Sequence, residues 1–203
     1  MTENAAALIE IGKLAFAFAK VNRGAYHEDG VRLESDTDHT VMMSLCVCAL
    51  GQKLYPSLDQ GKIAQFALVH DLVEAYAMDT DSFGLSETGR RAKEEREHYA
   101  FIKLKEQFGN TFSWIPDTIA AYEKLDTKEA RFVKTVDKLT PKIVHVLNQG
   151  QYFKNKGMTK EEMWDTYQDM TRKVEVKYGK EFPEIVALID ELILETRKIT
   201  YGN

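Results

Sequence analysis

The stretch FALVHDLVEAYAMD, residues 66–79, places a histidine and an aspartate next to each other inside a strongly apolar run. On a helix, His70 and Glu74 lie four residues apart and Asp71 and Glu74 three apart, so these side chains can converge while apolar neighbours pack elsewhere. Burying an unpaired carboxylate is costly, so Asp71 needs a cation or hydrogen-bond donors nearby. A divalent metal ion meets that need, because imidazole and carboxylate together suit Mn, Co, Zn or Fe. Taken alone, the pair also fits a hydrogen-bonded core histidine beside a capping acid.

Two distant residues share the character of this pair. His39 lies in SDTDHTVMMSL, at the beginning of an expected helix that Ser35 or Asp36 can cap. Asp137 lies in RFVKTVDKLTPKI, on or beside an apolar face, and the surrounding sequence offers it no obvious partner. The chain therefore contains a histidine, then a His-Asp pair, then a distant aspartate, each in a segment with helical periodicity.

Apolar residues recur at three- and four-residue steps over most of the chain, which predicts helices. We expect helices over residues 5–20, 40–54, 62–77, 87–108, 127–148, 159–178 and 183–199. No alternating pattern predicts a strand. Pro141 falls inside a helical segment and should kink that helix or end its first half.

The fold class expected from this pattern is all-α. We expect a single domain over residues 1–203, built as a bundle of about seven or eight helices. Its core should cover about residues 8–150. The C-terminal helices over residues 159–199 should pack on that core or lie at a subunit interface.

The composition excludes several classes of protein. A formal net charge of -5 and a pI near 5.6 argue against binding to a nucleic acid polymer, which needs a clustered basic face. No apolar stretch approaches the roughly eighteen residues of a membrane span, and the N-terminus has no cleavage-site pattern for export. Cys46 and Cys48 are too close in sequence to staple the fold, which fits a reducing compartment. We therefore expect a cytoplasmic protein with no membrane partner.

The pattern of His39, His70, Asp71 and Asp137, together with HDLVEAYAMD and RFVKTVDKL, resembles the HD-domain superfamily of metal-dependent phosphohydrolases. Over roughly residues 8–150 the chain is most similar to the bacterial 5'-deoxynucleotidase branch. The resemblance implies a helical HD domain in which these four residues bind one divalent metal ion. The candidate ions are Mn, Co, Zn, Fe and Mg. A second ion can bind together with the substrate phosphates.

The resemblance also implies roles for residues near the ligands. Glu74 and Asp79 stand at catalytic carboxylate positions: Glu74 would orient or deprotonate the attacking water, and Asp79 would complete the water network or hold a second ion. Arg23 matches an arginine that precedes the first histidine, and its guanidinium fork can clamp phosphate. Arg32 also precedes His39 and competes for that role.

Three departures from the deoxynucleotidase pattern concern the choice of nucleoside. Gly24 stands where the family commonly has tryptophan, and Met78 stands where it commonly has glycine. A family glutamate beside the sugar aligns with Ala121 or with Glu123, depending on a small slip in the alignment. These positions flank the metal ligands, so the departures leave the metal chemistry intact.

The expected function is hydrolysis of a deoxyribonucleotide phosphate ester, with a small-molecule nucleotide as substrate. A 5'-deoxynucleotidase would release phosphate from dNMPs. An alternative is a dNTP triphosphohydrolase, for example on dATP, which would need more cations to bind the longer phosphate chain. Three lysines at four-residue steps can supply them: Lys134, Lys138 and Lys142. A solvated ridge is the simpler expectation for these lysines. A further alternative is a non-catalytic nucleotide-binding sensor, against which the intact carboxylates argue. Because related enzymes often work as dimers, we expect a homodimer or higher homo-oligomer.

Other polar residues are expected to be structural or solvated. His27 and Glu34 can line the mouth of the same site, but exposed loop positions are the simpler expectation. His98 and His145 fit structural or surface positions. A charged run fits a solvated helix face with ion pairs at four-residue spacing: Arg90, Arg91, Lys93, Glu94, Glu95, Arg96 and Glu97.

Overall fold

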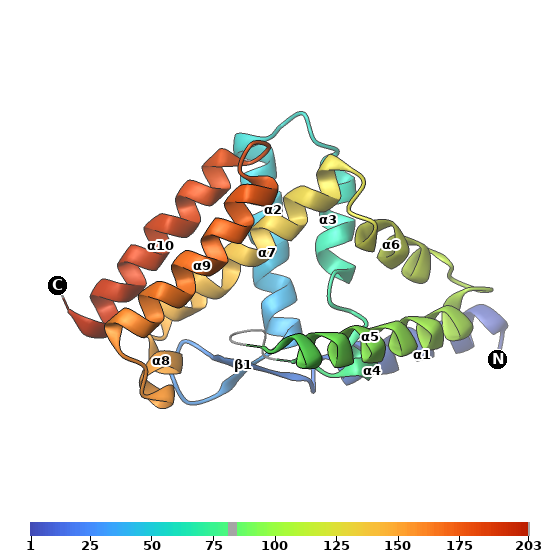
Figure 1. Ribbon diagram of the computed structural model, residues 1–203. Coiled ribbons are helices and arrows are strands. Elements are labelled where there is room, and N and C mark those ends of the chain that lie inside the picture. Colours follow the sequence, from blue (N-terminus) through green and yellow to red (C-terminus); the bar gives the residue numbers. More distant parts are fainter. Residues whose placement is uncertain (81–84, 203) are drawn as a thin grey trace.

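In the computed structural model, which describes residues 1–80 and 85–202, the chain is almost entirely helical (Figure 1). The helices are α1 (Glu3–Phe18), α2 (Asp36–Leu54), α3 (Gln60–Val69), α4 (Glu74–Ala77), α5 (Glu87–Phe108), α6 (Trp114–Glu123), α7 (Lys128–Leu147), α8 (Gln151–Lys156), α9 (Lys160–Tyr178) and α10 (Pro183–Tyr201). A short antiparallel hairpin of β1 (Asn22–Tyr26) and β2 (Leu33–Ser35) pairs Asn22 with Ser35 and Tyr26 with Leu33. The prediction of an all-α fold is confirmed. Within the described ranges, no helix is long and apolar enough to cross a membrane.

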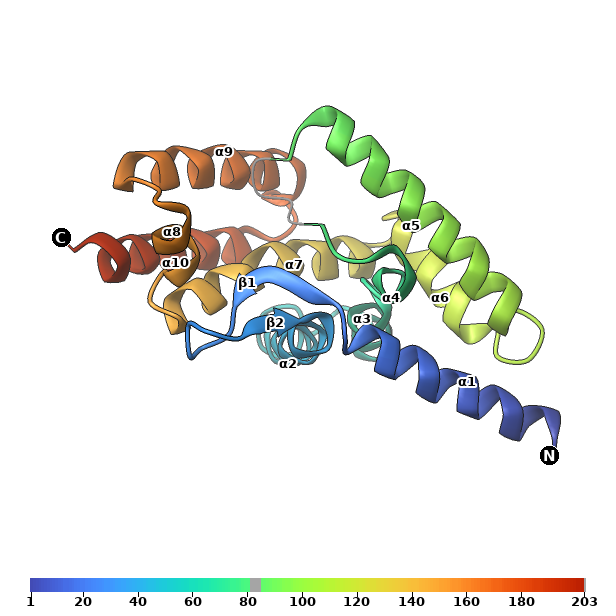
Figure 2. The same ribbon diagram turned by 90° about the horizontal axis from the view of Figure 1, so that it is seen from below.

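Helix α7 is the central element of the fold. It contacts α2, α3, α6, α9, α10 and β1. Its buried residues include Phe132, Val133, Val136 and Leu139, spaced as an apolar stripe along one side of a helix. Figure 2 shows α9 and α10 on one side of the molecule and α1, α5 and α6 on the other, with α7 between them. Residues on α7 are therefore placed to meet side chains from both halves.

Two clusters of buried apolar side chains form the core. The larger cluster joins α2, α3, α7, α9 and α10 and includes Met43, Phe66, Phe132, Tyr167 and Ile189. The smaller cluster joins α1, α5 and α6 to the segment around α4 and includes Leu14, Phe18, Leu104, Phe108 and Ile119. The C-terminal helices thus contribute to the larger core within the same chain.

The start of α2 is fixed by a capping box. Ser35 Oγ accepts a hydrogen bond from the backbone N–H of Asp38 at 3.1 Å, and the Asp38 carboxylate accepts one from the Ser35 N–H at 3.1 Å. Of the two capping candidates in the sequence, Ser35 is therefore the cap. This start places His39 on the inner face of the first turns of α2, where its side chain is fully buried.

The segment over residues 62–77 is not the continuous helix predicted from its periodicity. Helix α3 ends at Val69, a turn follows, and α4 begins at Glu74. In the turn, the N–H of Leu72 donates to the Val69 carbonyl at 3.1 Å and the N–H of Glu74 donates to the Asp71 carbonyl at 2.8 Å. These three-residue steps tighten the chain relative to an α-helix. The prediction that His70 and Glu74 share one helix face is therefore wrong, because a tight turn separates them.

The sequence pattern predicts neither the hairpin nor α6. Strands of five and three residues are too short for alternation to become visible, and their pairing depends on contacts with α7 and α8. In α6, Pro116 occupies the first turn, where a proline costs little because the first N–H groups of a helix have no partner inside it. Pro141 lies inside α7, which continues through it instead of ending there.

Two glycines around α8 allow a test of how tightly α10 is packed. Gly150 has a φ of 71°, and a Cβ there would lie 1.8 Å from Thr200 Oγ1. Gly157 has a φ of 63° but nothing within 4 Å of such a Cβ. We expect Gly157→Ala to lower the free energy of unfolding by about 1–2 kcal/mol through left-handed backbone strain. Gly150→Ala should lower the free energy of unfolding by about 1–3 kcal/mol more than Gly157→Ala, because its new methyl group would crowd Thr200. Equilibrium urea unfolding measures the loss of stability in each variant. Equal losses would contradict close packing of α10 against Gly150.

Candidate metal centre

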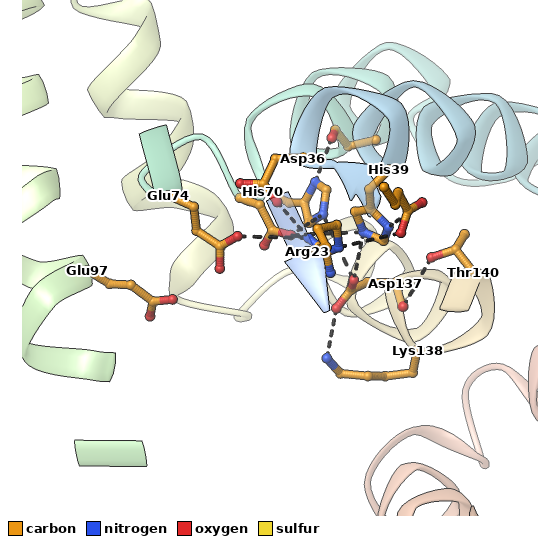
Figure 3. A network of polar contacts seen from close by, with 12 residues as sticks. Arg23, Asp36, His39, His70, Glu74, Glu97, Asp137, Lys138 and Thr140 are labelled. Carbon is orange, nitrogen blue, oxygen red and sulfur yellow. Dashed lines mark hydrogen bonds and ion pairs between the residues drawn. The ribbon is translucent and has the colours of Figure 1, made fainter. Parts of the chain in front are cut away.

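Four side chains from three separate parts of the chain meet near the middle of the molecule. His39 on α2, His70 and Asp71 in the turn after α3, and Asp137 on α7 each offer a ligand atom within 4.8 Å of the others. His39 Nε2 lies 3.4 Å from Asp137 Oδ1, and His70 Nε2 lies 3.0 Å from Asp71 Oδ2. Figure 3 shows His39, His70 and Asp137 directed toward one another. The structure thus brings together the four residues that the sequence pattern singles out.

This donor set fits a divalent cation. The Nε2 atoms of His39 and His70 are buried and have no hydrogen-bond partner among the described residues. His70 Nδ1 donates to the Ala67 carbonyl at 2.8 Å, which leaves the Nε2 lone pair facing the cluster. Although Asp71 Oδ2 is close to His70 Nε2, the two atoms are not aligned as a hydrogen bond, an arrangement that suits two ligands of one ion. The mixed nitrogen and oxygen donors suit Mn, Fe, Co and Zn.

The charge states of the four groups also suit metal binding. Burial lowers the pKa of His39, so this ring is neutral at about pH 7. Burial opposes ionisation of Asp137, but Lys138 and His39 outweigh it and hold the pKa of that carboxyl well below its ordinary range. The pKa of Asp71 is likewise held low, because contact with His70 outweighs burial. The pKa of His70 is raised by Asp71 against the effect of burial, and because an ion binds the neutral ring, metal affinity should fall as the pH is lowered.

Arg23, on β1, lies among carboxylates that surround this cluster. Its Nη1 atom is 3.2 Å from Asp36 Oδ1, 3.0 Å from Asp71 Oδ2 and 3.8 Å from Glu74 Oε2. Its Nε atom is 3.8 Å from Glu34 Oε2. Burial opposes a charged guanidinium, but the carboxylates outweigh it and raise the pKa of Arg23 further. The hairpin thus supplies the cation that compensates for several acids in a buried site.

Glu74, the first residue of α4, directs its carboxylate into the same site. Lys93 Nζ on α5 lies 2.7 Å from Glu74 Oε1 and 2.9 Å from Glu97 Oε1. The Lys93 side chain is only 23% exposed, so the prediction of a solvated position is wrong for this residue. Burial and the neighbouring Asp71 raise the pKa of Glu74 to about 9, with Lys93 opposing the rise. Sequence alone did not single out Lys93 because its partner lies on another helix.

Comparison with known proteins assigns this arrangement to a family. A family model described as an HD domain matches residues 18–177. The chain belongs to the HD domain family. A curated relative is 29% identical over 120 residues, namely the 5'-deoxynucleotidase YBR242W of Saccharomyces cerevisiae. The aligned part covers 57% of this chain and 49% of the yeast protein, so the chain spans about half the length of that relative.

Two solved structures share the HD-domain fold of this chain. A predicted metal-dependent phosphohydrolase from Magnetospirillum magnetotacticum superposes with a TM-score of 0.74 and 22% identity, over 97% of this chain and 98% of that one. A conserved hypothetical protein from Pyrococcus furiosus superposes with a TM-score of 0.59 and 22% identity, over 94% and 99% of the two chains. At this identity the similarity supports the fold. We refer below to His39, His70, Asp71 and Asp137 as the HD cluster.

Asp79 lies beside Asp36 and Glu74 and follows a strained stretch of backbone. It follows α4, and with Asp36 and Glu74 it forms a second group of oxygen atoms within 4.8 Å of one another. The preceding residue, Met78, has a φ of 64°. Glycine adopts this left-handed conformation without strain, whereas a residue with a Cβ pays about 1–3 kcal/mol. The backbone thus has the shape suited to glycine at position 78, and methionine adopts it here.

The two candidate arginines occupy different environments. The Arg23 side chain is 17% exposed and lies beside the HD cluster. The Arg32 side chain is 58% exposed, and its Nη1 atom lies 3.8 Å from Asp38 Oδ2. Geometry therefore favours Arg23 as the arginine nearer to a ligand of the cluster.

Two acidic residues near the hairpin are more important to the site than the sequence indicates. Glu34, on β2, is 4% exposed, so the expected exposed loop position is wrong. Asp36 does not cap α2 but is buried beside Arg23. Burial raises the pKa of each to about 7, with Arg23 opposing the rise. Only the position of Asp36, one turn before His39, could have drawn attention to it.

Two cavities meet at the HD cluster. The α5 cavity, about 430 Å³, is lined by residues that include His70, Glu74, Lys93, Glu97 and Glu123. The α9 cavity, about 400 Å³, is lined by residues that include Lys142, His145, Tyr167, Met170 and Val174. Six residues line both cavities: Arg23, Asp79, Thr80, Lys93, Asp137 and Lys138. Both volumes fall in the range of small-molecule sites, which is about 300–1,000 Å³.

The structure shows the surroundings of Glu123 and of the three lysines on α7. Of the two positions that align with the family glutamate, Glu123 lines the α5 cavity, and burial raises the pKa of its carboxyl. The prediction of a solvated lysine ridge on α7 is wrong for Lys142, which is buried, whereas Lys134 and Lys138 are partly exposed. Lys138 Nζ lies 2.8 Å from Asp137 Oδ2, Lys134 Nζ lies 3.9 Å from the same atom, and Lys142 is 3% exposed.

Proposed function

We propose that the chain is a metal-dependent phosphohydrolase that acts on deoxyribonucleotides, as a 5'-deoxynucleotidase that releases phosphate from dNMPs. The observation that carries the proposal is the HD cluster, with its two unpartnered Nε2 atoms at the junction of two cavities. The printed activity of the yeast relative supports the deoxynucleotide as substrate class. The catalytic residues would be Glu74 and Asp79, and Arg23 would bind the substrate phosphate.

The chain's own residues supply charge and proton transfer in this proposal. When bound, a divalent ion would polarise the phosphate and lower the pKa of a water molecule toward about 7. Once ionised, which its pKa of about 9 allows at alkaline pH, Glu74 would orient that water and take its proton, while Lys93 holds the carboxylate in place. Arg23 and Lys138 would add positive charge where negative charge develops on the phosphate. Asp79 would complete the water network or help to hold a second ion.

The α5 cavity is the place we assign to the nucleoside. Glu123 and Glu97 line it and offer acceptors for sugar hydroxyl groups, and Phe101 and Ile119 provide apolar walls. A neutral nucleoside suits this side better than further phosphate does, because acidic groups line it. This assignment keeps the sugar and the scissile phosphate next to each other at the HD cluster.

The test is a panel of dNMPs, NMPs and dNTPs, each assayed with Mn, Co, Mg and Zn. We expect orthophosphate and a deoxynucleoside from dNMPs, and slower release from NMPs. Chromatography identifies the products. Tripolyphosphate from a dNTP would replace the proposed activity with the triphosphohydrolase alternative. The lack of any product across the panel would favour a nucleotide-binding sensor.

Lys93→Met is expected to lower kcat about 10-fold, because Glu74 would lose the contact that holds it. Lys93 opposes the rise in the pKa of Glu74, so its removal should also shift the rising limb of the activity against pH to higher pH. Steady-state kinetics across pH measures both effects. The matched control is Lys105→Met, an exposed position on the same helix. A uniform loss with an unshifted pH profile would contradict this role.

The oligomeric state and the cellular compartment stay predictions. We expect a homodimer or higher homo-oligomer in the cytoplasm. Sedimentation equilibrium measures the mass in solution, and a monomer at all concentrations would contradict the first expectation.

A further inference from the structure

Within the described part of the chain, Lys142 is a buried lysine without a carboxylate partner. It lies on α7 and is 3% exposed. Among the ion pairs within residues 1–80 and 85–202, none involves its ammonium group, which lies 5.4 Å from the centre of the Tyr167 ring. Burial and the neighbouring Lys138 lower the pKa of Lys142 to about 7. An isolated buried ammonium group is costly, and an anion beside it would remove most of that cost.

The position of Lys142 ties it to the HD cluster. It lines the α9 cavity, which Asp137 and Lys138 also line. Lys138 lies one helical turn before Lys142, on the same side of α7. Asp137 lies five residues before it, a rise of about 7.5 Å along the helix axis. Lys142 therefore lies farther along α7, beyond the group that a metal ion in the HD cluster would hold.

Charge is unevenly distributed along the α9 cavity. The described acidic residues that line it, Glu34, Asp79 and Asp137, all belong to the surroundings of the HD cluster. Farther from the cluster, the charged lining residues are cationic. At the rim, Lys173 already pairs with Asp169 at 2.5 Å. Lys93 and Lys138 also line the cavity but pair with Glu74 and Asp137, and Arg90 is exposed. Among the described lining residues, Lys142 is therefore the buried cation left to meet a ligand that enters from the HD cluster.

We propose that the α9 cavity is a second anion subsite, in which Lys142 binds a phosphate group other than the one held at the HD cluster. The group is either free inorganic phosphate or a further phosphate of a dNTP that binds at the HD cluster in place of a dNMP, since both present the same oxyanion. A compact tetrahedral anion fits a point charge such as an ammonium group. The inference rests on the proposed function for what the HD cluster holds, but anion binding at Lys142 does not require turnover.

The test compares the wild-type protein with Lys142→Met, both freed of metal. Isothermal titration calorimetry with dAMP, dATP and inorganic phosphate separates the two sources of the anion. If the nucleotide supplies the second phosphate, wild-type protein binds dATP about 10-fold or more tightly than dAMP, and Lys142→Met abolishes the difference. If free phosphate is the occupant, the variant instead loses about 10-fold or more in affinity for inorganic phosphate. Unchanged affinity for all three ligands overturns the proposal.

Two controls keep the result interpretable. Methionine has nearly the size of lysine and removes a buried charge, so thermal unfolding of Lys142→Met should be unchanged or shifted upward. Lys198→Met, at an exposed position on α10, should leave all three affinities unchanged. Because the titrations use metal-free protein, loss of binding at Lys142 is distinguishable from failure of the proposed hydrolase activity. Anion binding at Lys142 in a protein without turnover would support this subsite and overturn only the proposed hydrolase activity.

Discussion

Asp71→Asn is expected to reduce phosphate release by about 10³-fold or more and to lower the metal content of the purified protein. Asp71 supplies one of the two carboxylates of the HD cluster, with Oδ2 3.0 Å from His70 Nε2. Asparagine keeps the shape of the side chain but removes the charge that would balance a divalent ion. A bound ion contributes several kcal/mol to stabilising charge in the transition state, and each 1.36 kcal/mol corresponds to about a tenfold change in rate.

The variant also loses the ion pair between Asp71 and Arg23, which spans 3.0 Å, so folding must be checked alongside activity. Equilibrium unfolding and elemental analysis after dialysis against each metal provide the two readouts. Asp165→Asn, at an exposed position on α9, is the matched control and should retain wild-type activity and metal content. A folded Asp71→Asn protein with full metal content and full activity would remove Asp71 from the ligand set.

Much of the fold and of the metal cluster followed from local sequence. The long helices have strong helical periodicity, and α7 has an apolar stripe that fixes which face is buried. His39 and Asp137 were recognisable because each is an ionisable residue in or beside an apolar helical face, where burial without a partner is costly. Such a position narrows the possible roles of a residue before any coordinates are known.

The residues that escaped prediction depend on contacts between distant parts of the chain. Lys93 looks like its charged neighbours on α5, and only its contact with Glu74 distinguishes it. Lys142 looks like part of a solvated ridge until α9 covers it. The hairpin that carries Arg23 and Glu34 is too short to produce a periodic pattern, although it places both against the HD cluster. Local periodicity carries no information about which surface another element will cover.

The turn after α3 shows why a correct residue assignment can rest on a wrong geometry. Helical spacing predicted that His70, Asp71 and Glu74 converge, and they do lie in one site. They converge because the backbone tightens after Val69 and restarts as α4 at Glu74. The tight turn lets adjacent His70 and Asp71 both face the cluster, which successive residues of a regular helix, rotated by about 100°, do less readily.

Glu74→Gln is expected to lower kcat by about 10²–10⁴-fold at about pH 9 and above, where Glu74 is ionised, while metal content stays at the wild-type level. Glutamine preserves the size of the side chain and a hydrogen-bond acceptor but cannot take a proton from water. Glu74 lies outside the HD cluster and contacts Lys93 at 2.7 Å and Arg23 at 3.8 Å, so the change should leave the four ligands in place. The loss should appear in kcat more than in KM, because proton transfer is needed in the transition state and not for binding.

Glu74→Gln should lower turnover without changing metal binding, so it tests the catalytic role of Glu74 separately from the metal site. Glu106→Gln, at an exposed position on α5, is the matched control and should behave as the wild-type protein. If Glu74 only positions Arg23 and Lys93, the neutral glutamine should retain most of the activity, since its carbonyl oxygen still accepts a hydrogen bond from Lys93. If Glu74 takes the proton, no hydrogen bond by glutamine replaces that step. Single-turnover measurements of phosphate release at saturating metal therefore discriminate between a base and a positioning residue.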